Sequence, residues 1–184
     1  MNIPRPPGDP RRSELSDLAD ERGRLSRELA AMRKALQLAD AAQQELSDLR
    51  GKVGSASRWS TYDIFGGGKI ATAAVHRRLD EAREVAAEAD YRLTLLRTEL
   101  ADLHGTMPTF PLLAISARTK LVDLWFDNIF TDMAVHERIR QARHNVDHSL
   151  QVVQEVREQL TSRVAQAQAR LISIEAKRRD LLAR

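Results

Sequence analysis

Cysteine is absent from the 184-residue sequence, and aromatic residues make up only 4% of it. The absence of cysteine excludes a disulfide framework and a thiolate metal site. The scarcity of large rings argues against a compact globular core, since aromatic side chains supply much of the buried area in such cores. No hydrophobic run approaches the roughly 18 residues that suggest a membrane-spanning helix, and the N-terminal residues lack the apolar segment of a signal peptide. We therefore expect a cytoplasmic protein.

Charged residues, in contrast, are abundant at 30%, and the apolar residues are mostly Leu, Ala and Val. This composition is typical of long helices and coiled coils. Four of the six prolines lie within residues 1–12, where they oppose helix formation. We predict a disordered, proline-rich tail over residues 1–12 and a single elongated helical domain over residues 13–184.

Apolar residues recur at spacings of three and four along most of this domain, which indicates three long helices, at roughly 13–50, 69–104 and 118–183. The sequence GKVGSAS, residues 51–57, is expected to form a linker after the first helix. Two polar residues interrupt the predicted core of that helix and are candidates for fixing its partner and register. The core positions of the first helix run Leu15, Leu18, Arg22, Leu25, Leu29, Met32, Leu36, Ala39, Gln43 and Leu46.

The third helix is predicted to be about 90 Å long, whereas the first two are each about 50 Å long. They cannot cover it as one compact body, so the third helix either bends or uses a second molecule to bury its apolar stripe. We therefore expect a homo-oligomer. The residues expected to form the assembly seam are Val153, Val156, Leu160, Val164, Leu171 and Ile174.

Aromatic residues cluster at the two predicted bends between helices. VHRRLDEAR at 75–83 is similar to VHERIRQAR at 135–143, and an aromatic cluster precedes each segment, which suggests an internal duplication. If the chain folds back at both bends, these residues converge and form a small aromatic head. The predicted head and interaction residues are Trp59, Tyr62, Phe65, Trp125, Phe126, Phe130, His76 and His136.

Motifs that could carry chemistry are weak. The GGGK sequence at 66–69 departs from the Walker pattern, which needs glycine at the position of Asp63 and Ser or Thr at that of Ile70. His144 and His148 are four apart and form a half-site for zinc, but no third ligand is evident. His76 and His136 could act as an acid/base pair or hydrogen-bond within the head; the second interpretation is favoured, since no nucleophile accompanies them. We predict no catalytic residue, no cofactor and no metal, and hence not an enzyme.

The motif W-S-T-Y-D-I-F-G-G-G-K-I, with L-D-E-A at 79–82 and F-D-N-I-F-T-D-M at 126–133, resembles a motif, W-x-T-Y-D-x-x-G-G-G, of an uncharacterised group of bacterial coiled-coil proteins. The resemblance covers residues 55–145. It implies a coiled-coil fold and no known activity.

Taken together, these patterns predict an all-α protein: an elongated antiparallel bundle, or coiled coil, of three long helices with an aromatic head at the bends. The expected role is that of a self-associating scaffold or adaptor, or of a filament-forming component, with a protein partner. One alternative is a peripheral membrane-binding or membrane-remodelling helical hairpin that binds lipid through its long amphipathic helices. The apolar segment 108–130 could itself be an interfacial element, but Asp123, Asp127 and Asp132 interleave with the aromatic residues, so the core of the head or a docking patch for a protein partner is favoured. A second is a coiled coil associated with nucleic acid through the basic residues after 160; nucleic acid is disfavoured because the surplus charge is small.

Overall fold

The computed structural model describes residues 10–63, 69–106 and 132–183, and the side chains of residues 10–55, 81–105 and 139–183. The described residues form three helices and no strand: α1 (Pro10–Asp63), α2 (Lys69–Thr106) and α4 (Asp132–Ala183). They contain 54, 38 and 52 residues. At 1.5 Å per residue, α1 and α4 are each about 80 Å long and α2 is about 57 Å long.

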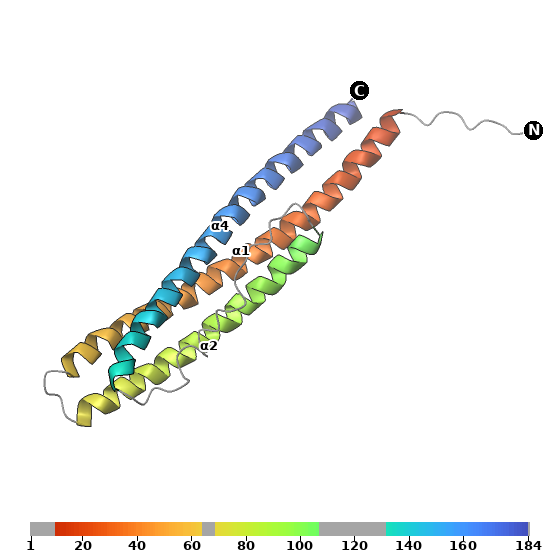
Figure 1. The fold of residues 1–184 in the computed structure, drawn as a ribbon. Coiled ribbons are helices and arrows are strands. Elements are labelled where there is room, and N and C mark those ends of the chain that lie inside the picture. The colour runs from red at the N-terminus through yellow and green to blue at the C-terminus, as the bar shows by residue number, and fades with distance from the viewer. Residues whose placement is uncertain (1–9, 64–68, 107–131, 184) are drawn as a thin grey trace, which may run out of the picture.

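The helices form an elongated antiparallel bundle, as predicted (Figure 1). α1 runs in one direction, and α2 and α4 both run back along it, parallel to each other. α1 contacts both α2 and α4, whereas the described parts of α2 and α4 do not approach each other closely at the backbone. α1 is thus the central helix of the fold.

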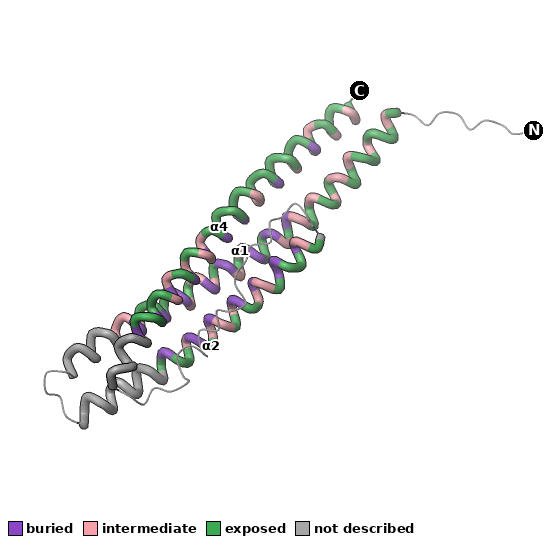
Figure 2. Tube along the Cα trace, viewed as in Figure 1, coloured by how far each residue is buried: buried purple, intermediate pink, exposed green. Residues whose placement is uncertain are grey.

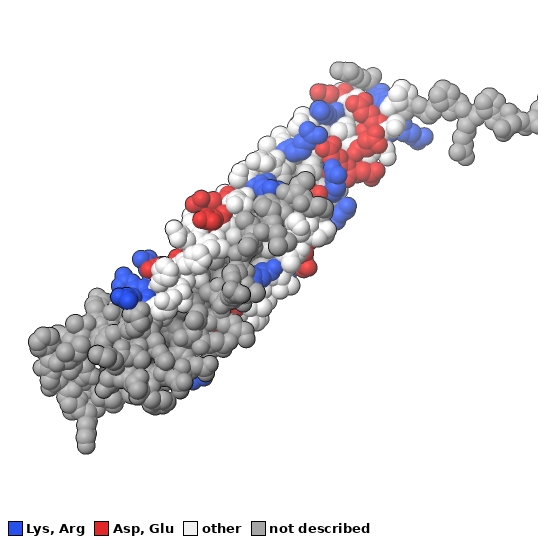
Figure 3. Space-filling view, in the orientation of Figure 1, with Lys and Arg blue, Asp and Glu red and all other residues white. Residues whose placement is uncertain are grey.

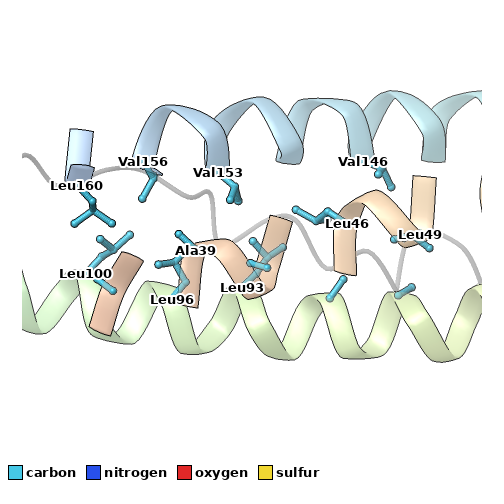
Figure 4. Close-up of a cluster of buried hydrophobic side chains, with 14 of the residues drawn as sticks. Ala39, Leu46, Leu49, Leu93, Leu96, Leu100, Val146, Val153, Val156 and Leu160 are labelled. Atoms are coloured by element: carbon cyan, nitrogen blue, oxygen red, sulfur yellow. The ribbon is translucent and has the colours of Figure 1, made fainter. Parts of the chain in front are cut away.

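A single apolar core holds the three helices together. Purple segments follow the inner faces of the helices and alternate with exposed turns (Figure 2). Leu93 and Leu96 of α2 point toward α1 from one side, and Val153 and Leu160 of α4 point toward it from the other (Figure 4). Such burial, and not intrinsic propensity, supplies most of the stability of long amphipathic helices. The core of α1 consists of Leu29, Met32, Ala35, Ala39, Ala42, Leu46, Leu49 and Val53.

Alanine dominates the part of α2 nearest the first bend. Ala82, Ala86 and Ala89 are all buried, and their small side chains let another helix approach closely. That helix is α1, whose buried residues opposite these alanines include Leu46 and Leu49.

The predicted linker after Arg50 is wrong, because α1 continues without interruption to Asp63. Leu49 and Val53 carry the buried stripe through this segment. Glycine disfavours a helix by only about 1 kcal/mol per residue, a cost that burial of two large apolar side chains offsets, at roughly 1.5–3 kcal/mol each. Tertiary packing therefore overrides the local preference for a turn.

The extra length of α1 also answers how the third helix buries its stripe. α4 is one continuous helix of 52 residues, and α1 is long enough to lie beside it over nearly its whole length (Figure 1). Neither a bend nor a second molecule is required. The expected first residues of that helix, 118–131, lie outside the described residues.

One of the two polar residues expected in the core is on the surface. Arg22 is exposed, and its Nε atom lies 3.2 Å from Glu175 Oε1 of α4. Gln43 is half-buried. At the end of the bundle where Arg22 lies, α4 is the only described helix that α1 faces, so its apolar stripe is narrower than the three-four spacing suggested.

Candidate interaction surfaces

All eight predicted head residues fall outside the residues whose side chains are described. Trp59 and Tyr62 belong to the last turns of α1, and His76 and His136 belong to the first turns of α2 and α4. The backbone therefore brings these four positions to one end of the bundle, where α1 ends and α2 and α4 begin (Figure 1). Phe65, Trp125, Phe126 and Phe130 lie outside the described residues, and the head itself stays a prediction.

The residues predicted as an assembly seam lie in the core of a single chain. Val153, Val156, Leu160 and Ile174 are buried, and Val164 and Leu171 are half-buried against the same core. Their stripe is covered by α1, so the argument that it needs a second molecule no longer applies. Because α1 of the same chain covers this stripe, self-association has to use another surface.

The candidate zinc half-site stays incomplete. His144 and His148 are both exposed on α4. Within the three described ranges, no group of three or more His, Cys, Asp or Glu residues is placed to hold a metal ion. Within the same ranges, no helix has an apolar stretch long enough to cross a membrane.

Ion pairs set the register of α1 against α2. Lys34 pairs with Glu99, and Lys52 Nζ lies 3.7 Å from Glu81 Oε2. The two lysines are 18 residues apart on α1, and the two glutamates are 18 residues apart on α2 in the opposite direction. This constant register places Thr106, the last residue of α2, opposite position 27 of α1.

Of the two glutamates in these ion pairs, Glu99 is the less exposed, with only 9% of its surface accessible to solvent. The hydrogen bond from Lys34 to the Glu99 carboxylate, together with the negative charge of that group, raises the pKa of Lys34 above its ordinary value of 10.5. The lysine is therefore charged at neutral pH, and it compensates the carboxylate that α2 brings against α1.

A second set of ion pairs sets the register of α1 against α4. Arg50 Nε lies 2.8 Å from Asp147 Oδ1, and Asp40 Oδ1 lies 2.6 Å from Arg157 Nε. With the Arg22–Glu175 contact, these pairs follow one flank of the interface in a single antiparallel register. Each exposed pair contributes only about 0–1 kcal/mol. Their regular spacing nevertheless disfavours a slipped alignment, because a slip would break all of them together.

α1 and α4 extend together beyond the end of α2 (Figure 1). We call this part the two-helix end and define it as residues 10–26 of α1 and 170–183 of α4. Two ion pairs link its helices: Arg22–Glu175, and Arg170–Glu21 at 2.8 Å between Nη2 and Oε1. The guanidinium of Arg11 donates to the carbonyl oxygen of Leu181 near the tip. Among the described residues, the two-helix end is thus an antiparallel pair of helices held by polar contacts between α1 and α4.

The basic excess expected near the C-terminus lies on this two-helix end, but acidic residues lie beside it. Lys and Arg side chains alternate with Asp and Glu side chains on the visible face (Figure 3). Arg170 and Glu175 are already engaged with α1. The surface there is of mixed sign, which is the usual character of a solvated coiled coil.

Large apolar residues on the outside of the bundle were missed by the periodicity argument. Ile172 is 69% exposed and Leu182 is 63% exposed, both on α4, and Tyr91 of α2 is also exposed, with its ring 5.9 Å from the Arg92 guanidinium carbon. Ile172 lies between Leu171 and Ile174 but outside the three-four spacing of the core. That displacement was the available signal that it faces outward.

No protein-family model, curated protein or solved structure matches the chain. The argument about function therefore rests on the residues and on the geometry of the bundle.

Proposed function

We propose that this protein is a structural and interaction protein, a self-associating coiled-coil scaffold or adaptor of the cytoplasm, without catalytic activity. The observation that carries the proposal is the shape: two helices of about 80 Å lie side by side along the whole bundle. Such a body holds whatever binds at its two ends far apart. A chain that buries its apolar residues in a thin rod exposes much more surface than a sphere of equal mass, as a spacer or scaffold requires.

Ion pairs between helices support the same role. A scaffold needs a fixed length, and the ion pairs that fix the register of α1 with α2 and with α4 disfavour sliding of the helices. Self-association supplies the second requirement, because a scaffold or a filament joins several copies or partners. The large apolar residues exposed on the far part of α4 support this second requirement.

The test is a joint measurement of mass and shape, by light scattering on a sizing column and small-angle X-ray scattering over a concentration series. We expect a maximum dimension above about 80 Å and a mass that rises above 20.7 kDa with concentration. A monomer at every concentration would contradict self-association. A compact particle would contradict the scaffold role as a whole.

Two parallel measurements address the alternatives from the sequence. Sedimentation of the protein with anionic vesicles would favour the membrane-binding alternative. Binding to DNA or RNA that weakens steeply with added salt would favour the nucleic-acid alternative. The scaffold proposal expects neither result.

A further inference from the structure

The outward face of α4 carries an apolar residue that the described part of the chain leaves uncovered. Ile174 is 1% exposed and faces α1, whereas Ile172 is 69% exposed. Two residues correspond to about 200° around a helix of 3.6 residues per turn. Ile172 therefore lies on the side of α4 that faces away from the described core of the bundle.

This face has the spacing of a coiled-coil seam. Glu158, Ala165, Ile172 and Arg179 follow one another at intervals of seven residues, and all four are exposed. Ala169, also exposed, lies between the two central members. We define these five residues as the α4 outer face. Apolar residues at a seven-residue interval are what a helix presents to a partner helix.

Charge on the α4 outer face has opposite sign at its two ends. Glu158 accepts a hydrogen bond of 2.8 Å from Gln154 Nε2, and Arg179 Nε donates to the Glu175 carbonyl oxygen at 3.4 Å. Neither Glu158 nor Arg179 has a partner of opposite charge in the described part of the chain. Both charges are therefore available to a second molecule.

A second copy in antiparallel orientation satisfies this pattern. With a twofold axis between residues 168 and 169, Glu158 of each copy lies opposite Arg179 of the other, and Ala165 of each lies opposite Ile172 of the other. The small residue leaves room for the large one at both positions. A parallel arrangement would instead place like charges opposite each other, at a cost in free energy.

We propose that two copies of this chain associate through the α4 outer face, antiparallel and about a twofold axis. The proposal rests on the proposed function, since it names the surface by which the scaffold self-associates. A closed dimer requires a self-complementary patch: if one residue of the first copy contacts a second residue of the other copy, the second residue of the first copy contacts the first residue of the other copy. The chain satisfies it with one apolar pair and one ion pair, each used twice.

Sedimentation equilibrium of the full chain tests the surface. Ile172→Asp should weaken the dimer at least tenfold, because it places a charge in the centre of the seam. The matched control is Tyr91→Asp, which changes another exposed large apolar residue, on α2 and away from the α4 outer face, and should leave the dimer unchanged. Both variants alter exposed side chains, and equal circular dichroism at 222 nm confirms that they fold.

A charge exchange tests the ion pairs. Glu158→Arg alone and Arg179→Glu alone should each weaken the dimer, since each creates like-charge neighbours across the axis. The double variant should recover the affinity of the natural chain. Loss in both single variants without recovery in the double one would overturn the antiparallel pairing.

Cross-linking tests the orientation of the two copies. Because the chain has no cysteine, an introduced cysteine is the only residue that can form a disulfide. Ala169→Cys lies within one residue of the axis, so two copies should form a disulfide on oxidation. Ala165→Cys is the control: in an antiparallel pair the two residues are seven positions apart, or about 10 Å along the helix, beyond the reach of a disulfide. Equal cross-linking of both variants would indicate a parallel pair and overturn the proposal.

The outcomes separate the surface from the function. If the natural chain is dimeric and Ile172→Asp is equally dimeric, the proposal that the dimer forms through the α4 outer face is wrong, whereas the proposal of self-association stands. If the natural chain is monomeric at every concentration, both proposals fail.

Discussion

Two glycines inside α1 offer the sharpest test of the fold. Gly51 and Gly54 lie in the segment that the sequence pattern assigned to a linker, whereas the structure places both inside a continuous helix. A Cβ atom built at either position meets no other heavy atom within 4 Å. Replacement by alanine should therefore remove the backbone penalty of glycine without a clash, which stabilises the protein by about 0.5–1 kcal/mol at each site.

The double variant Gly51→Ala/Gly54→Ala should gain about 1–2 kcal/mol in free energy of unfolding. For a domain of this size, that corresponds to a rise of roughly 2–8 °C in Tm. The measurement is thermal and urea-induced unfolding followed by circular dichroism at 222 nm. Its control is Gly23→Ala, in a part of α1 that sequence and structure both make helical, where the new Cβ would lie 3.7 Å from Arg27 Nη1, an ordinary contact.

The control shows what one helical glycine costs in this chain. If Gly23→Ala stabilises while the double variant is neutral or destabilising, residues 51–54 adopt a non-helical conformation, and α1 ends where the sequence pattern had placed its end. That result would also remove the reason for which α1 covers α4 along its length.

Three further predictions follow from the core and the ion pairs. Leu96→Ala should destabilise the protein by about 2–5 kcal/mol in urea unfolding, because it leaves a cavity between α2 and α1, whereas the exposed Leu182→Ala should change stability by less than about 0.5 kcal/mol; equal effects would refute the core. At pH 7 the natural chain should have a higher free energy of unfolding than Lys34→Met, and this difference should decline as the pH rises above 10.5. The reason is that the pKa of Lys34 is raised, so that its stabilising charge is lost only at high pH. A difference in the free energy of unfolding that does not depend on pH would contradict this. Exchange of Arg22 and Glu175, as Arg22→Glu/Glu175→Arg, should restore most of the loss of up to about 1 kcal/mol seen in either single variant; additive losses would mean that the two groups do not interact.

Helix type and heptad periodicity could be predicted well, while helix ends and individual core positions could not. The rule that glycine and serine end a helix assigned residues 51–57 to a linker, yet Val53 is buried in the core and keeps the segment helical. Arg22 occupied a predicted core position but lies on the surface, since periodicity cannot tell how many helices surround a given turn. The exposed position of Ile172 was missed because the periodicity argument followed only one apolar stripe on each helix, and Ile172 lies on a different face of α4.

The candidate interaction residues divide in the same way. The predicted seam, Val153 to Ile174, was correctly identified as an apolar stripe, but whether α1 or a second molecule covers it depends on the length of α1. The aromatic head stays a prediction at the level of side chains, although the backbone brings Trp59, Tyr62, His76 and His136 to one end of the bundle.

By itself, the sequence determined that this chain forms long amphipathic helices, because apolar residues that recur at spacings of three and four fall on one face of a helix, and a long helix is stabilised when that face is buried. Only the tertiary structure decided which helix is central, where each helix ends, and which apolar residues stay outside. Those outcomes depend on pairings between residues far apart in the chain, such as Lys34 with Glu99 and Asp40 with Arg157. A local pattern sets the face of a helix, whereas its partner and register are set by the sum of many contacts made only after the chain has folded back on itself.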